Sequence, residues 1–199
     1  MLQSLAGICA AVLAILALSG TLPMTLATVA VIVMGGAQFI GAGGISAAFG
    51  RRSSTSGLGG LAGMMSGGIA FQALCGAAAV AGGILTLANV VPMTFLPVSV
   101  IILGACSMAG SGGLHFLNLS MSGSSIGSPM TLEATRQAIV ATSGVGIMVG
   151  EGSVALGVLA LAGVSAFLLT EIAILALGLG LMAGGAALAA HGASALARS

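Results

Sequence analysis

Residues 15–25 read ILALSGTLPMT, and residues 84–94 repeat the pattern as ILTLANVVPMT. In both copies an apolar run ends at Gly20 or Asn89, and a proline follows three residues later. Gly and Asn commonly end a helix, and Pro is favoured in the first turn of the next one. The stretch therefore predicts two apolar helices joined by a tight turn, which is a helical hairpin.

A third copy of this pattern lies at residues 158–168, where VLALAGVSAFL lacks the proline. The copies are separated by 69 and then 74 residues, and glycines recur at the same offsets on both sides of the turns. Self-similarity of this kind is the signature of a repeat architecture. We predict a single domain, 1–199, of three repeated hairpins at about 1–50, 57–119 and 129–193. The recurring glycines form three columns: Gly7, Gly76 and Gly150; Gly35, Gly104 and Gly178; Gly41, Gly110 and Gly184.

The composition places these hairpins in a membrane. Hydrophobic residues make up 58% of the 199 residues and charged residues only 4%, whereas soluble domains carry roughly 25% charged residues. This excludes a soluble enzyme and a nucleic-acid-binding domain, and the lipid bilayer is the expected surrounding. Six apolar segments are long enough to span it, so we predict an all-α membrane protein with six transmembrane helices. The segments are 4–21, 24–47, 59–89, 94–117, 136–162 and 166–190.

The arginines predict the orientation. Arg51 and Arg52 lie in the first long loop, Arg136 follows the second, and Arg198 lies near the C-terminus. With six spans all four fall on one side of the membrane. By the positive-inside rule we expect both termini in the cytoplasm.

The glycine columns point to close helix packing. Between apolar helices in lipid, van der Waals packing and small residues replace the hydrophobic effect as the source of association. We expect the columns to pack the six helices within one chain. The alternative is a docking face for another membrane protein or a second copy.

Three polar side chains are candidate intramembrane sites. Glu151 is expected near the centre of the fifth span, where a charged side chain costs roughly 2.5–3.5 kcal/mol on insertion scales. It should therefore be neutral, paired or facing a cavity, and it aligns with Ala77 and Ile8, so the repeat does not require it. Glu171 is expected about 9 Å below the hairpin turn, as a solvated residue near the helix end. His115 is expected to meet unpaired carbonyls at the end of the fourth span.

No catalytic, cofactor-binding or metal-binding residues are predicted. The chain contains no Lys and no Asp, which excludes a phosphate-binding loop with lysine and a Ser-His-Asp triad. The two histidines belong to different repeats, and no cysteine lies at ligand spacing from them. We therefore expect no enzyme.

The repeated pattern resembles a known family. An apolar helix ending in ILAL, a turn with Pro-x-Thr and a second helix with glycines at its middle and end are similar to the short-repeat membrane family that includes HdeD. The matching stretches are 15–44 and 84–113, with a weaker copy at 158–187. The resemblance implies six helices in three hairpins, a bacterial inner-membrane location and an association with acid stress. It implies no catalytic residues.

Two functions follow as expectations. The first is a non-catalytic, HdeD-like scaffold or accessory subunit, in a membrane complex or a membrane stress response, that meets a membrane-protein partner or a second copy through its glycine-rich faces. The alternative is a small proton-linked transporter or channel that uses Glu151.

Overall fold

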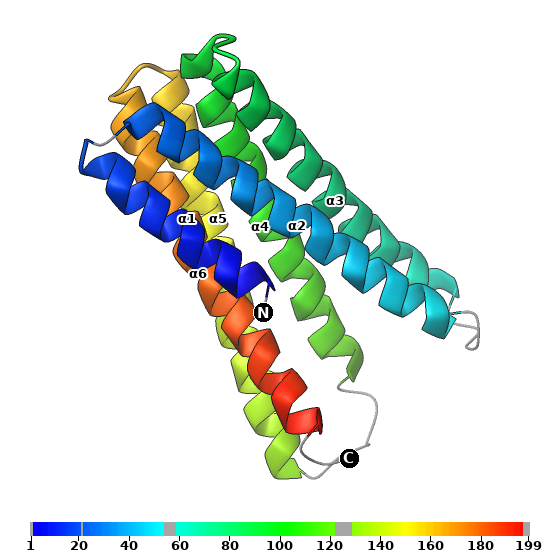
Figure 1. Cartoon of the computed structure of the whole chain (residues 1–199). Helices are drawn as coiled ribbons and strands as arrows, with labels where there is room; N and C mark the ends of the chain where they lie inside the picture. The colour runs from blue at the N-terminus through cyan, green and yellow to red at the C-terminus, as the bar shows by residue number, and fades with distance from the viewer. Residues whose placement is uncertain (1, 21, 54–58, 122–128, 197–199) are drawn as a thin grey trace.

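The computed structural model describes the backbone of residues 2–20, 22–53, 59–121 and 129–196, and side chains within 3–20, 22–42, 70–111 and 144–185. The described residues form six α-helices (Figure 1), so the predicted all-helical class is confirmed. The helices are α1 (Leu2–Leu18), α2 (Pro23–Ser53), α3 (Gly59–Leu87), α4 (Pro92–Met121), α5 (Pro129–Leu161) and α6 (Ala166–Leu196).

Five helices, α2 to α6, are long and apolar enough to cross a membrane. The chain is therefore a multi-pass membrane protein. The first helix ends at Leu18, before the end of the predicted 4–21 span. Its apolar part is Gln3–Leu18. At 1.5 Å per residue this part is about 24 Å long, compared with a hydrocarbon thickness of about 30 Å. Of the six predicted spans, five are thus confirmed by length and composition.

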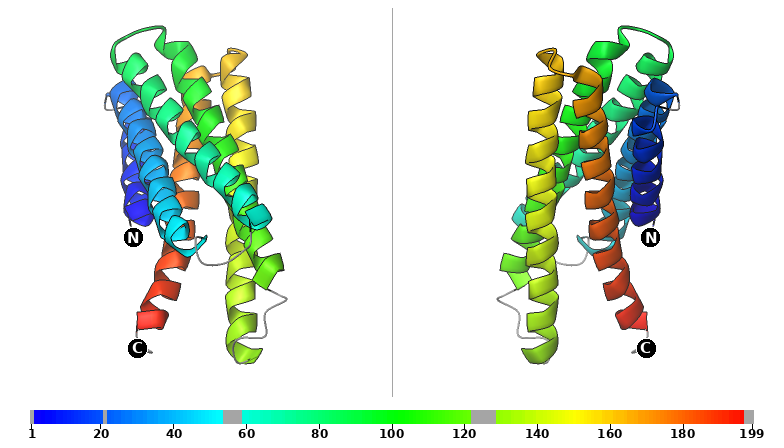
Figure 2. Two further views of the ribbon diagram at one scale, coloured as in Figure 1. Left: turned by 90° about the vertical axis from the view of Figure 1, so that its right-hand side faces the viewer. Right: turned by 90° about the vertical axis from the view of Figure 1, so that its left-hand side faces the viewer.

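The three tight turns lie at the same end of the molecule (Figures 1 and 2). At the second turn, the N–H of Asn89 donates to the carbonyl of Thr86 at 3.0 Å, and the N–H of Val90 donates to that of Leu85 at 3.0 Å. Equivalent bonds recur at the third turn, where Gly163 and Val164 donate to Ala160 and Leu159. This pair of bonds is the Schellman motif, which closes a helix C-terminus.

At each of the three tight turns, one residue just after the end of the preceding helix adopts a left-handed backbone conformation. The φ angles are 86° at Gly20, 59° at Asn89 and 85° at Gly163. These are the positions at which the sequence pattern placed Gly, Asn and Gly. The left-handed region favours glycine and tolerates asparagine, which explains the choice of residue at the three turns.

We expect Gly163→Val to destabilise the protein by about 1–2 kcal/mol, because a β-branched residue is strained at this φ. No atom outside the local backbone lies within 4 Å of a Cβ added there, so the effect reports backbone strain and not a clash. The matched variant Asn89→Gly should retain wild-type stability. Unfolding free energies in mixed micelles test this, and equal stability of Gly163→Val and wild type would contradict it.

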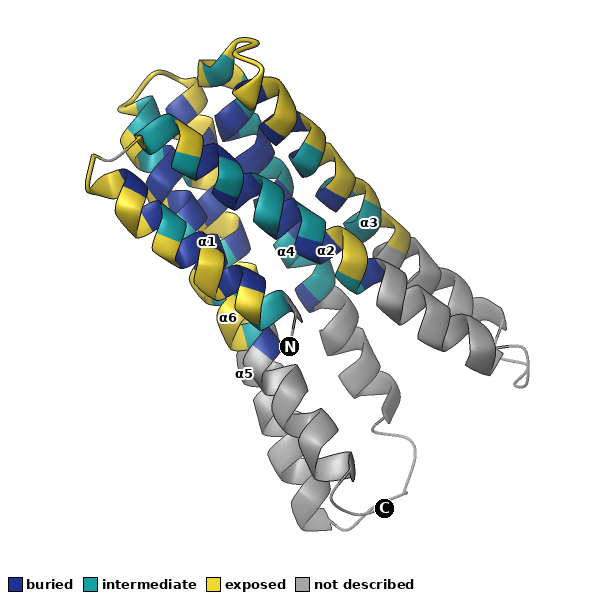
Figure 3. Cartoon of the chain, viewed as in Figure 1, coloured by how far each residue is buried: buried dark blue, intermediate teal, exposed yellow. Residues whose placement is uncertain are grey.

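The helices form an inner group and an outer group. The inner helices α2, α4 and α6 contact one another, whereas each outer helix lies against two of them: α1 against α2 and α6, α3 against α2 and α4, and α5 against α4 and α6. The first helix, α1, packs against the last helix, α6 (Figure 1). Buried faces turn toward the centre and exposed faces outward (Figure 3).

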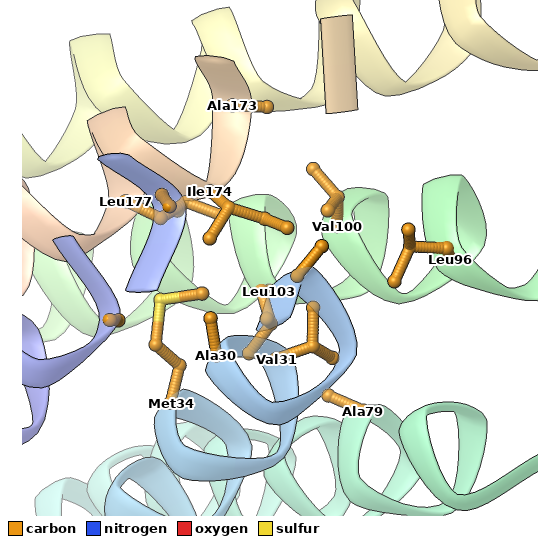
Figure 4. Packing of buried hydrophobic residues seen from close by; sticks show 13 residues of the cluster. Ala30, Val31, Met34, Ala79, Leu96, Val100, Leu103, Ala173, Ile174 and Leu177 are labelled. Carbon is orange, nitrogen blue, oxygen red and sulfur yellow. The ribbon is translucent and has the colours of Figure 1, made fainter. Parts of the chain in front are cut away.

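Apolar side chains from the inner helices fill the centre of the bundle (Figure 4). The largest are Val31 and Met34 of α2, Val100 and Leu103 of α4, and Ile174 and Leu177 of α6, all no more than 1% exposed. They are separated by the same 69 and 74 residues as the sequence copies. The buried positions of the three inner helices therefore agree with the spacing of the sequence copies.

Candidate functional site

The described glycines bring neighbouring hairpins together at three interfaces, which we call seams: α2–α3, α4–α5 and α6–α1. At each seam a glycine of one helix faces a glycine of the next. The pairs are Gly35 with Gly76, Gly104 with Gly150, and Gly178 with Gly7. A Cβ added to Gly104 would lie 2.8 Å from the carbonyl oxygen of Gly150, and one added to Gly7 would lie 2.6 Å from that of Gly178. The backbones therefore touch, as the small-residue pattern predicts for helices in lipid.

The third glycine column has a different neighbour. A Cβ on Gly41 would lie 2.8 Å from Nε2 of Gln3, and one on Gly110 would lie 3.6 Å from Nε2 of Gln72. Gln3 and Gln72 are themselves 69 residues apart, so the contact repeats within the first two hairpins. Gly184 is half-buried on α6. On this helix its neighbour Gly185 makes a close contact instead, with Ser4 of α1.

Glu151 lies on the outer surface of the bundle. Its side chain is exposed, and so are its repeat equivalents Ile8 and Ala77. The stretch of α5 around it, Gly144–Leu161, has 22% of its residues buried, compared with 33–44% for the corresponding stretches of α2, α3, α4 and α6. The acid therefore projects from the least covered of these spans, away from the filled centre.

Two glycines leave open space beside this carboxyl group. Gly144 and Gly152 are both exposed on α5, and a Cβ on either would meet nothing within 4 Å. Gly150, between them on the same helix, is buried against Met108 of α4. Glu151 therefore lies between the face of α5 that packs against α4 and an exposed face of α5.

Glu171 is buried, and the expectation that it is a solvated end residue is wrong. Its side chain is 1% exposed, and its Oε1 atom has no hydrogen-bond partner. The sequence gives its depth but not the helix face that it occupies. In the structure, α1, α2, α4 and α5 all pack against α6, which covers this position although it lies near the turn.

A second buried polar group lies on α2. Gln38 is 1% exposed, and its Oε1 atom also has no partner. Ser107, its repeat equivalent on α4, donates its hydroxyl to the carbonyl of Leu103 at 3.0 Å. The side chain of His115 lies outside the described residues, as do those of the arginines. The described candidates are therefore Glu151 on the outer surface of α5 and the buried side chains of Glu171 on α6 and Gln38 on α2, and no contact between them is observed.

Two thiols from neighbouring helices lie close together, which the sequence pattern does not predict. Cys75 of α3 and Cys106 of α4 are 31 residues apart and show no metal or redox spacing, but their side chains are near enough to interact. The thiol of Cys106 also lies 3.7 Å from the carbonyl oxygen of Gln72. Among the residues with described side chains, no three His, Cys, Asp or Glu residues lie together as metal ligands.

No family model, no curated protein and no solved structure matches this chain.

Proposed function

We propose that this protein is a non-catalytic accessory subunit that binds another membrane protein through the outer face of α5. The position of Glu151 carries this proposal. Ionisable residues within membrane spans almost always face the bundle interior or a cavity and are paired there. Glu151 instead faces outward from its own chain, so a partner outside the chain must satisfy it.

The chemistry of that partner follows from the carboxyl group. We propose a transmembrane helix of another protein that presents a hydrogen-bond donor or a cation opposite Glu151. A second copy of this chain supplies no arginine at this depth, because its arginines lie at residues 51, 52, 136 and 198. Arg136 precedes Glu151 by 15 residues on α5, about 22 Å along the helix. Open space at Gly144 and Gly152 allows the partner helix to approach closely.

The architecture supports a scaffold built from repeats. We propose three repeated hairpins, each with an outer and an inner helix. The glycine pairs, the left-handed residues at the turns and the filled centre all recur at the offsets of 69 and 74 residues, which supports this arrangement. The HdeD-like resemblance belongs to the same proposal, as does a bacterial inner membrane with both termini in the cytoplasm.

Native mass spectrometry of a mild-detergent extract tests the partner. We expect a second membrane protein at fixed stoichiometry in the wild type. A hydrogen bond to a charged group contributes about 1.5–3 kcal/mol, so Glu151→Gln should weaken binding by about tenfold or more. Gly152→Leu should abolish binding, because leucine fills the space beside the carboxyl group without a clash inside the chain.

Ala77→Leu is the matched control, since Ala77 is exposed at the position equivalent to Glu151 on α3. It should co-purify the partner as the wild type does. A monomer or homo-oligomer in every extract would overturn the proposal, and so would a partner that is lost equally in the Ala77→Leu control.

Proton-linked transport through Glu151 is the alternative function. The carboxyl group lies on the outer surface, and six apolar side chains fill the centre. This arrangement favours the accessory role over transport. Proton flux in liposomes that disappears in Glu151→Gln would reverse this preference.

A further inference from the structure

A line of positions spaced by seven residues runs along the α6–α1 seam. A Cβ on Gly185 would lie 2.6 Å from the backbone nitrogen of Ser4, and one on Gly178 would lie 3.0 Å from that of Ala11. From the first contact to the second, the position on each helix changes by seven residues. Seven residues are about two helical turns, so the two contacts lie on the same face of each helix. Seven residues before Gly178 on α6 lies Glu171, and the same spacing places this residue opposite the last turn of α1. Its side chain is buried, and its Oε1 atom has no hydrogen-bond partner.

The other two seams carry no ionisable group at this position. The repeat equivalents of Glu171 are Thr28 on α2 and Pro97 on α4. Their carbonyl oxygens lie 3.6 Å and 3.2 Å from a Cβ added to Gly83 and Gly157 on the facing helices. At this position the α2–α3 and α4–α5 seams therefore have neutral residues, and only the α6–α1 seam has an acid.

The described side chains around Glu171 include no positive charge that could balance a carboxylate. No arginine, lysine or histidine is among the residues with described side chains. On the helices packed against α6, the titratable groups in that part of the chain are Cys9 on α1, Cys106 on α4 and Glu151 on α5, and α2 contributes none. Cys9 and Glu151 are exposed, and the thiol of Cys106 donates to the carbonyl oxygen of Gln72 on α3.

We propose that Glu171 is a proton-binding site that controls closure of the α6–α1 seam. A neutral carboxyl group can be enclosed between the two helices, whereas a carboxylate without a partner requires water or a counter-charge. Loss of the proton then favours separation of α1 from α6, which exposes the group. The proposal is independent of any partner at Glu151.

Thermal unfolding of the purified full-length protein in detergent, between pH 5 and pH 9, tests the proton site. Protons held by the folded state are lost as pH rises, so the wild-type unfolding temperature should fall with pH, by roughly 5 °C or more. Glu171→Gln mimics the neutral form and should be independent of pH. Glu151→Gln removes the other acid that has a described side chain and should keep the wild-type fall. A flat wild-type profile, or a fall retained in Glu171→Gln, would overturn the proposal.

Spin-label distances test whether the proton acts at this seam. Labels at exposed Val12 of α1 and Leu179 of α6, in a background with the three cysteines replaced by alanine, should move apart as pH rises. The distance should be constant in Glu171→Gln. Labels at exposed Ile40 of α2 and Leu74 of α3 report a seam without an acid and should not move. Equal movement at both seams, or none at either, would refute control of the α6–α1 seam by Glu171.

Discussion

Replacing Gly150 by leucine is expected to abolish the folded bundle. A Cβ at this position would lie 2.7 Å from the carbonyl oxygen of Gly104 and 2.5 Å from Cγ of Met108. The first of these is a backbone atom, so relief requires α4 and α5 to move apart along the whole seam. Overpacking commonly costs 1–3 kcal/mol and occasionally more, and we expect about 3 kcal/mol or more here.

The yield of monodisperse protein after detergent extraction measures this effect, together with the unfolding free energy. Gly152→Leu is a stringent control, because it places the same side chain two residues away on the same helix, where no atom lies within 4 Å. It should match the wild type in yield and stability. Similar losses in both variants would show that helix propensity or expression, and not the seam, is responsible.

Shortening Leu103 to alanine is expected to cost roughly 3 kcal/mol of unfolding free energy. Leu103 is fully buried where the three inner helices meet, and loss of a buried leucine leaves a cavity that costs 2–5 kcal/mol. Leu177→Ala should have a similar effect, because Leu177 is its repeat equivalent on α6 and is also buried.

Leu159→Ala on α5 is the matched control for the core. Leu159 is 47% exposed, so detergent or lipid covers its position in both the native and the unfolded states. We expect a change within about 0.5 kcal/mol. Unfolding free energies of the variants, measured in mixed micelles, test this prediction. Equal losses of stability in the Leu159 and Leu103 variants would contradict the central packing.

The predicted helices and turns agree with the structure because local rules determine them. Gly20, Asn89 and Gly163 stand where a left-handed residue must end a helix, and their positive φ angles follow from this requirement. Pro23 and Pro92 begin α2 and α4, as first-turn prolines do. The first helix ends at Leu18, before the predicted bound, because Gly20 adopts a left-handed backbone that ends the helical hydrogen bonds.

The candidate site was less predictable, because depth in a membrane does not give the helix face. Glu151 was expected at mid-membrane, but an outward position on α5 requires knowledge of which neighbours α5 has. Glu171 was expected to be solvated because of its shallow depth. Its burial depends on the four helices that pack against α6, among them α1, which is far from it in the sequence.

The amino-acid sequence by itself determined that this protein is helical, belongs in a membrane and repeats a hairpin-forming pattern, since composition and local turn chemistry specify these properties. The tertiary structure alone decided that the first and last helices meet, that Gly7 packs against Gly178, and that Glu151 faces outward while Glu171 is buried. The physical reason is that apolar helices in lipid are alike on all sides. Which faces meet therefore depends on backbone contact at small residues, and this contact is a property of pairs of helices and not of either one alone.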